Sequence, residues 1–212
     1  MAENRIAVFA SGTGSNFKNI LEKTSEGFIP ATIALLVTDN YSAGAIDIAN
    51  SHNIPVKVFS KNDFLNREDL NVQLLNTLKD MHINYIVLAG YLKLIGANIV
   101  KAYSNKILNI HPALLPSFGG KGMYGNHVHH AVYENGVKIS GATVHLVNEI
   151  YDAGSIVLQK AISIENVNSP DEIAKKVLKV EHEIYPMAVK LLVENRLNVI
   201  GKRVEILGEN VN

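Results

Sequence analysis

The feature that most constrains the fold of this chain is an alternation of short, β-branched apolar runs with segments of helical periodicity. Near-continuous apolar strands separated by helices are typical of a parallel sheet with helices on both faces. The runs expected to form strands are 6–10, 32–37, 56–58, 85–89 and 106–110. A helix is expected over 43–52, and leucines at helical spacing predict another across Leu70–Leu78. The sequence therefore predicts an α/β fold with a Rossmann-like, mostly parallel twisted sheet.

The pattern changes after Pro112, where the chain becomes rich in glycine and histidine. Two later runs, 143–147 and 155–164, are expected to pair as antiparallel strands, and 196–207 to form a terminal hairpin. No repeat, linker or low-complexity segment interrupts the sequence. We therefore expect a single domain over 1–212, with an N-terminal half over about 1–105 and a second part over about 106–212.

A long helix is expected to begin just after Ser169. Serine can cap a helix, Pro170 suits the first helical position, and Glu172 lies where a capping box needs an acid. Pro186, farther along the same segment, is expected to kink or end the helix.

The composition excludes several classes of protein. The chain has 20 basic and 20 acidic residues and 47% hydrophobic residues, which excludes a disordered chain. No basic run exceeds two residues, so we expect no nucleic acid partner. Without cysteine there is no disulfide and no thiolate metal site, which indicates a reducing compartment. No apolar stretch is long enough to span a membrane and no leader is apparent, so we expect a cytoplasmic protein.

A glycine-rich loop, Ser11-Gly-Thr-Gly-Ser-Asn16, follows the first predicted strand and precedes a predicted helix. Glycines let backbone N–H groups approach a phosphate, and a helix start adds unpaired donors and a favourable dipole. The loop therefore indicates a phosphorylated ligand. A dinucleotide fingerprint would need a third glycine where Phe17 stands. A plain tight turn, with Ser15 or Asn16 capping the helix, is the structural alternative.

Asn109 and His111 end a predicted strand at the carboxyl edge of the sheet, where α/β folds place ligands. Residues two apart in an extended chain point to the same side, and Pro112 disfavours helical geometry at His111. An amide and an imidazole together suit acyl transfer, because both can stabilise an oxyanion and the histidine can carry a proton. A nearby carboxylate would keep the imidazole charged at neutral pH, and Asp152 is the candidate. Taken singly, the three residues also fit ordinary structural roles.

Three closely spaced histidines, His127, His129 and His130, raise the question of a metal site with His145 and Glu149. On a helix the three are too crowded to bind one ion without distortion. We therefore expect no metal, and we place these histidines on a loop or on a helix that begins near Gly125.

The chain resembles the phosphoribosylglycinamide formyltransferases, within the family of formyltetrahydrofolate-dependent formyltransferases. The resemblance extends over residues 5–201, and the segments that carry it are Ser11–Asn16, Val87–Leu94, Leu108–Pro116, Gly141–His145, Asp152–Gly154 and Glu181–Pro186. The Asn-x-His-Pro-x-Leu-Leu-Pro segment is shared by the wider family and indicates the chemistry. The Gly-Ser-Asn loop is the narrower signal and indicates the acceptor.

The resemblance implies a formyltransferase fold and transfer of a formyl group from 10-formyltetrahydrofolate to the amine of glycinamide ribonucleotide, in de novo purine biosynthesis. It implies a tetrahedral intermediate stabilised by Asn109 and protonated His111, with Asp152 raising the pKa of His111. The residues implied to bind the ribonucleotide are Gly14, Ser15 and Asn16, at its phosphate, and Glu181, near its ribose. Those implied to border the folate are Arg67, the backbone of Leu92, Lys93, Leu94 and Ile95, and Asn109. The implied partners are small molecules, with no membrane, and the implied state is a monomer or homodimer.

The glycine-rich stretch 118–125 is longer than in the shorter-looped members of the family, so Lys121, Tyr124 and the nearby histidines receive no role. The nearest alternative is formyltetrahydrofolate deformylase, in which water replaces the amine and an N-terminal regulatory domain is added. Methionyl-tRNA formyltransferase would need a further C-terminal domain and a basic surface. A nucleotide-binding module without catalysis is the alternative from a different class.

Overall fold

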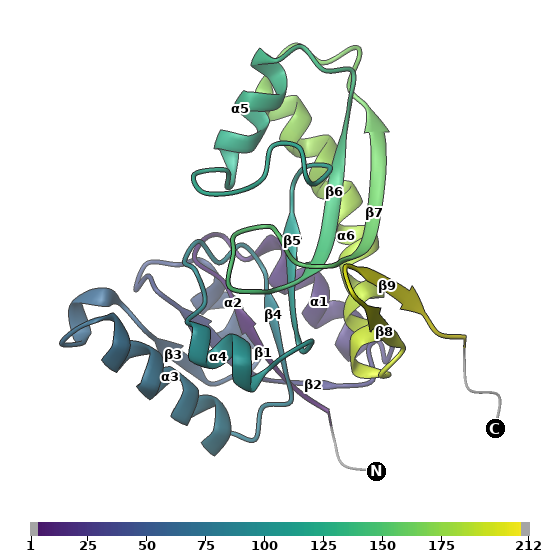
Figure 1. Cartoon of the computed structure of the whole chain (residues 1–212). Helices are drawn as coiled ribbons and strands as arrows, with labels where there is room; N and C mark the ends of the chain where they lie inside the picture. The colour runs from purple at the N-terminus through teal and green to yellow at the C-terminus, as the bar shows by residue number, and fades with distance from the viewer. Residues whose placement is uncertain (1–3, 209–212) are drawn as a thin grey trace. The chain divides into compact units, whose positions relative to one another are not determined.

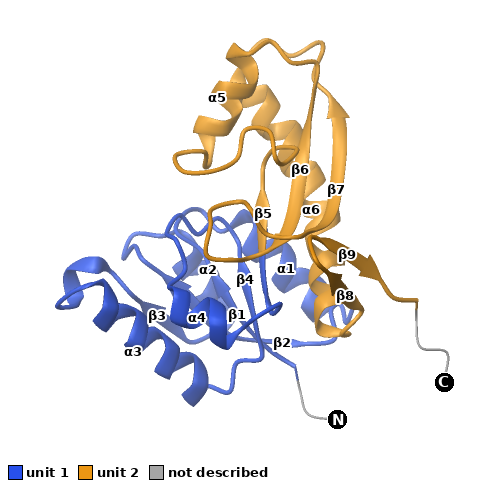
Figure 2. Cartoon of the chain, in the orientation of Figure 1, with its two compact units in different colours: residues 1–108 blue, residues 109–212 orange. Residues whose placement is uncertain are grey.

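The computed structural model describes residues 4–208, which divide between Leu108 and Asn109 into two compact units (Figure 1). Figure 2 colours the two units separately. Strand β5, Ile107–His111, contains the boundary between them. Each unit has its own sheet segment and its own helices, and each is described by itself.

The first unit is a parallel α/β unit, as predicted. Its strands lie in the order β3-β2-β1-β4, and β1 pairs in parallel with both β2 and β4. The strands are β1 Arg5–Phe9, β2 Thr32–Thr38, β3 Val56–Val58 and β4 Tyr85–Leu88. The helices are α1 Ser15–Ser25, α2 Ala45–Ser51, the 3₁₀ turn η1 Lys61–Asp63, α3 Arg67–Asp80 and α4 Ala97–Ala102.

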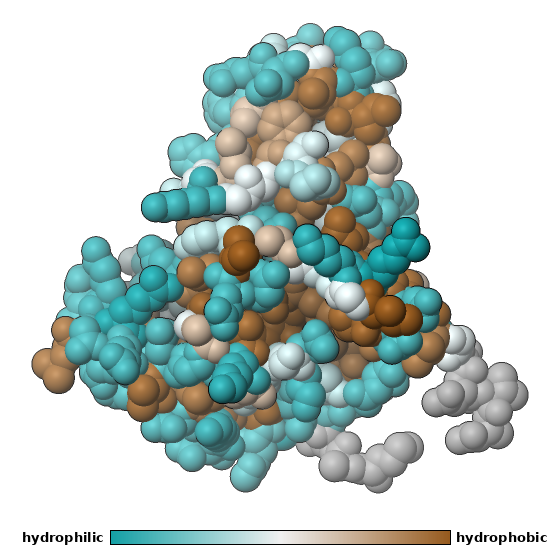
Figure 3. Space-filling model, in the orientation of Figure 1, coloured by the Kyte–Doolittle hydropathy of each residue, from teal (hydrophilic) through white to brown (hydrophobic). Residues whose placement is uncertain are grey.

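The helices of the first unit form two packed pairs, α1 with α2 and α3 with α4. The strand order reverses direction after β3, so right-handed crossovers place α1 and α2 on one face of the sheet and α3 on the other. The visible surface around α3 is mostly hydrophilic (Figure 3), while Leu74 and Leu78 of the same helix are buried. The leucine spacing therefore predicted the inward face of α3 correctly.

The second unit combines antiparallel strands with two packed helices. Its strands follow β5 in the order β6-β7-β9-β8, and β6 pairs with β7 in antiparallel register, as predicted. The strands are β6 Ile139–Leu146, β7 Ile156–Ser163, β8 Leu197–Ile200 and β9 Arg203–Ile206, the last two forming the predicted hairpin. The helices are α5 Asn126–Glu134 and α6 Pro170–Val193. Helix α6 packs against α5, β6 and β7.

Helix α6 begins as its sequence predicts but extends beyond its internal proline. The Ser169 hydroxyl accepts a hydrogen bond from the Glu172 N–H at 3.3 Å, with Pro170 in the first turn. The helix does not end at Pro186 but continues to Val193. Proline removes one helical hydrogen bond, and the fully buried Tyr185 beside it shows that packing stabilises this turn.

Among the described residues, no helix is both long enough and apolar enough to cross a membrane.

Candidate active site

The glycine-rich loop of the first unit is fixed by the ends of two strands. The Ala10 N–H donates to Val37 O at 3.0 Å, and the Ser11 N–H donates to Gly90 O at 3.1 Å. Gly14 is the N-cap of α1 with a φ of 80°, and a Cβ on it would lie 2.9 Å from Ala45 Cα. Ser15 and Asn16 are therefore the first helical residues, not the cap, and they lie at a helix start, where the helix dipole favours an anion.

The second predicted segment of the first unit, Leu92–Ile95, is joined to this loop by a side chain. The Ser11 hydroxyl accepts a hydrogen bond from the Leu92 N–H at 3.1 Å. Arg67 Nη2 donates to Leu94 O at 3.2 Å, which fixes one end of the guanidinium. Lys93 also forms an ion pair with Asp39, at 3.5 Å, and Ile95 is buried. The sequence-predicted residues of this unit thus lie in the glycine-rich loop, in Leu92–Ile95 and, for Arg67, at the start of α3.

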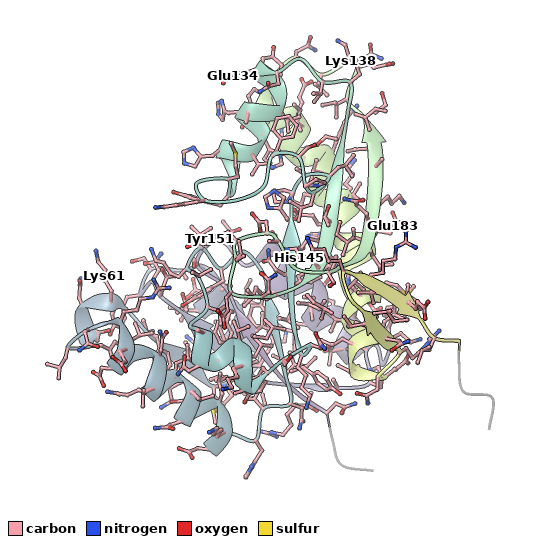
Figure 4. The ribbon with its side chains drawn as sticks, in the orientation of Figure 1. Lys61, Glu134, Lys138, His145, Tyr151 and Glu183 are labelled. Atoms are coloured by element: carbon pink, nitrogen blue, oxygen red, sulfur yellow. The ribbon has the colours of Figure 1, made fainter. Side chains whose placement is uncertain are left out.

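In the second unit four polar side chains form one cluster. Asn109 and His111 lie on β5, His145 lies on β6, and Asp152 lies in the loop that follows β6, next to the Tyr151 labelled in Figure 4. Asp152 Oδ2 is 3.6 Å from His111 Nδ1, and its Oδ1 is 3.6 Å from His145 Nε2. Asn109 Nδ2 is 3.0 Å from His145 Nε2. The Asp152 carboxylate therefore lies between the rings of His111 and His145, and the Asn109 amide contacts the ring of His145.

A short backbone segment, Phe118–Gly120, contacts both members of the His111–Asp152 pair. Phe118 O lies 2.8 Å from His111 Nε2, and the Gly120 N–H donates to Asp152 Oδ2 at 2.8 Å. Phe118 and Gly120 have φ values of 55° and 95°, in the region that glycine adopts most easily. A Cβ on Gly119 would lie 2.5 Å from Leu115 Cδ2. The glycines of this segment let backbone atoms approach the cluster closely.

The turn after His111 is held by two side chains from β6 and β7. Thr143 donates to Ala113 O at 2.7 Å and accepts from the Leu115 N–H at 3.0 Å. Gln159 Nε2 donates to Thr143 Oγ1 at 2.9 Å and to Leu115 O at 2.8 Å. Thr143 is fully buried. These bonds fix the chain that leaves β5 and thereby the base of the cluster.

The surroundings of His111 define which nitrogen carries its proton. A carbonyl oxygen only accepts, so Nε2 carries the hydrogen that contacts Phe118 O. Burial lowers the pKa of His111, and Asp152 and the Phe118 carbonyl raise it by less, so the pKa lies below its ordinary value. Asp152 thus acts in the direction the sequence suggested, but desolvation outweighs its effect on the pKa of His111. The Nε2–H donor is present in either protonation state.

Asp152 is ionised more readily than an ordinary aspartate. Burial raises its pKa, but His145, His111 and the Gly120 N–H together lower it more, so the net pKa is below the usual value. Its φ of 52° is a left-handed conformation, which Asp and Asn adopt more readily than most residues. A charged carboxylate is therefore held beside both imidazoles.

The histidines after the glycine-rich stretch lie on helix α5, which begins after Gly125. His129 is buried, and burial with the nearby His111 lowers its pKa to about 4. Over residues 4–208, no group of three or more His, Cys, Asp or Glu side chains is arranged to hold a metal ion. Glu181, the residue implied to lie near the ribose, is buried on α6.

The sequence did not predict that His145 contacts Asn109, or that Thr143 and Gln159 hold the turn after His111. One signal was available, since Thr143 and His145 are two apart on a strand and share a face. The register between β6 and β7 shifts between Val144 and His145, and such irregularities re-aim side chains. That shift has no sequence signature, so the position of the His145 ring could not be predicted.

Comparison with known proteins identifies the family of this chain. The chain matches the family model described as formyl transferase over residues 4–189. It is 45% identical to the chloroplastic phosphoribosylglycinamide formyltransferase of Arabidopsis thaliana over 91% of this chain and 66% of that protein, just under two thirds of its length. It is 39% identical to the phosphoribosylglycinamide formyltransferase of Bacillus subtilis over 89% of this chain and 94% of that protein.

Among solved structures, glycinamide ribonucleotide transformylase 1 from Symbiobacterium toebii superposes with a TM-score of 0.91. The two sequences are 33% identical, and the match covers 97% of this chain and 95% of that one. The predicted fold class, a parallel core with antiparallel C-terminal strands, is therefore confirmed by both the strand pairing and this likeness. By its sequence match over 4–189 and its architecture, the chain belongs to the formyl transferase family.

Proposed function

We propose that this protein transfers the formyl group of 10-formyltetrahydrofolate to the amine of glycinamide ribonucleotide, in purine biosynthesis. The observation that carries the proposal is the cluster in the second unit, where Asp152 lies 3.6 Å from the rings of both His111 and His145 and Asn109 contacts the latter. The named relatives at 39% and 45% identity support the acceptor, since both are phosphoribosylglycinamide formyltransferases.

The chemistry requires an oxyanion to be stabilised and a proton to be moved. The substrate amine forms a bond to the formyl carbon, the bond from that carbon to the folate nitrogen breaks, and one proton passes from the amine to the leaving nitrogen. Asn109 Nδ2–H and His111 Nε2–H donate to the oxygen on which negative charge develops. Asp152, held ionised, stabilises His111 while it carries positive charge. The amine is itself the nucleophile, so no covalent enzyme intermediate is needed.

The proposed binding residues come from the glycine-rich loop, α3 and Leu92–Ile95 in the first unit, and from β5 and α6 in the second. Gly14, Ser15 and Asn16 hold the ribonucleotide phosphate, and Glu181 binds near the ribose. The folate is bordered by Arg67, the backbone of Leu92, Lys93, Leu94 and Ile95, and Asn109. Both units belong to one formyltransferase domain over 1–212. The enzyme acts in the cytoplasm as a monomer or homodimer whose partners are small molecules.

The deciding experiment mixes purified protein with 10-formyltetrahydrofolate and follows the folate product with and without glycinamide ribonucleotide. Turnover that requires the amine supports the proposal. Turnover without the amine identifies a deformylase instead. No turnover, with phosphorylated ligands still bound, identifies a binding module and contradicts the proposal.

A further inference from the structure

We propose that His145 is a positioning residue that fixes the orientation of the Asn109 carboxamide. The inference rests on the proposed function, in which Asn109 donates a hydrogen bond to the formyl oxygen. His145 is buried, with 2% of its surface exposed, whereas Asn109 is only partly buried. The ring therefore lies behind the amide, which borders the surface of the cluster.

The two ring nitrogens of His145 face partners of opposite kinds. Nδ1 is 2.9 Å from Leu146 O, and a carbonyl oxygen only accepts, so Nδ1 carries the hydrogen. A neutral imidazole has a single N–H, so Nε2 then presents a lone pair. That lone pair faces Asn109 Nδ2 at 3.0 Å. Asp152 Oδ1 lies farther from the same nitrogen, at 3.6 Å.

This tautomer permits only one orientation of the Asn109 amide. With Nδ2 toward His145, one N–H donates to the ring, and the second N–H is left for a substrate oxygen. If the amide were rotated by half a turn, Oδ1 would face the Nε2 lone pair and two acceptors would oppose each other. The Leu146 carbonyl thus determines, through one ring, which atom of Asn109 reaches the reacting group.

The surrounding backbone keeps the ring in place. A Cβ on Gly154 would lie 3.3 Å from His145 Nδ1 and would overlap Leu146 O, so the backbone at Gly154 passes against both partners. The Leu146 N–H donates to Ser155 O at 2.9 Å, which fixes the peptide that follows His145. His145 therefore has little freedom to turn its nitrogens, as a positioning role requires.

A double-mutant cycle tests the coupling. His145→Asn shortens the side chain so that it no longer reaches Asn109, and we expect kcat to fall about 10- to 100-fold with both KM values changed less than about threefold. His145→Gln keeps an acceptor near the Nε2 position and is expected to recover most of that loss. In the Asn109→Ala background, His145→Asn should lower kcat by less than about twofold further, because its effect passes through Asn109. Losses that multiply would overturn the proposal.

The control is His82→Asn, which replaces an exposed histidine of the first unit whose φ of 53° suits asparagine. It is expected to leave kcat and both KM values unchanged. If Asn109→Ala alone keeps the wild-type kcat, the part of Asn109 in the proposed function fails, whatever His145 does.

A second measurement is independent of activity. Long-range ¹H–¹⁵N NMR of the wild-type protein reports which ring nitrogen is protonated. We expect a protonated Nδ1 and an unprotonated Nε2 at His145, unchanged in Asn109→Ala because the Leu146 carbonyl sets the tautomer. A spectrum with the proton on Nε2 would overturn the inference even if the His145 variants failed to fold.

Discussion

The candidate sites of the two units differ in the groups that form them, which are backbone N–H groups in the first unit and mainly side chains in the second. In the first unit the proposed phosphate site would consist of backbone N–H groups at the start of α1, where Gly14 leaves no room for a Cβ. In the second unit the cluster uses side chains from β5, β6 and the loop after β6, together with the backbone of 118–120. A backbone site of this kind needs one short stretch of sequence, whereas the side-chain site needs three segments brought together by strand pairing.

The largest effects on kcat are expected from substitutions in the second unit. Removing side chains of its cluster tests whether that site depends on them. His111→Ala and Asp152→Asn should each lower kcat at least about 100-fold, since each removes an interaction made in the transition state. Both variants should retain the fold, and asparagine tolerates the left-handed backbone at 152. The measurement is steady-state kinetics with circular dichroism. Near-normal kcat in either variant would show that the assigned role is wrong, and Glu149→Gln, at an exposed position, is the control.

The corresponding test of the first unit alters the backbone. Gly14→Val should raise KM for the ribonucleotide about tenfold or more, and by more than KM for the folate, because the Cβ meets Ala45 and the φ of 80° disfavours valine. A loss of about 1–3 kcal/mol in stability is expected from the strained conformation. Gly12→Ala is the structural control, since a Cβ there meets no atom within 4 Å. Equal increases in both KM values would indicate general unfolding and contradict a local phosphate role.

A third variant tests how much the hydrogen bonds that hold the turn after His111 contribute to stability. Thr143→Val keeps the shape of a buried residue but leaves the Leu115 N–H and one bond of Gln159 without their partner. We expect a loss of about 1–3 kcal/mol in the free energy of unfolding, measured by urea denaturation. A change below the error of the titration would mean that the turn after His111 is held by other contacts.

The smallest effect concerns acid stability and His129. Its pKa is lowered to about 4 from 6.5, so the unfolded chain binds more protons between those values and stability is lost as pH falls through that window. The loss at pH 5 is about 1–2 kcal/mol. Within residues 4–208 its buried Nδ1 has no hydrogen-bond partner, so His129→Leu should be neutral or stabilising at pH 7 and should reduce the loss at pH 5.

The measurement for His129→Leu is the melting temperature at pH 7 and pH 5. Part of the acid loss should remain in the variant, because the lowered pKa of His111 acts in the same direction. An unchanged difference between the two pH values would show that His129 does not take up the proton.

The same contrast explains what the sequence could predict. The strand over Val56–Val58 and the capping of α6 depend on local pattern and local hydrogen bonds, and both were predicted. Asn109 and His111 were predicted to share one side of a strand end, and both lie on β5, because alternation along one strand is also local. The position of His145 depends on a register shift between two strands. The contacts of Phe118 and Gly120 are made by backbone atoms, which every residue has, so no residue type marks them.

The contact between His111 and Phe118 affects how strongly His111 would bind a neutral oxygen compared with a negatively charged one. His111 Nε2 already has an uncharged acceptor at 2.8 Å. A neutral formyl oxygen that took its place would exchange one carbonyl for another, with little net gain. An oxygen bearing negative charge is a stronger acceptor than either. In the proposed mechanism, the Nε2–H of His111 therefore stabilises the negatively charged oxygen of the transition state much more than the neutral formyl oxygen of the bound substrate. Catalysis requires this kind of differential binding.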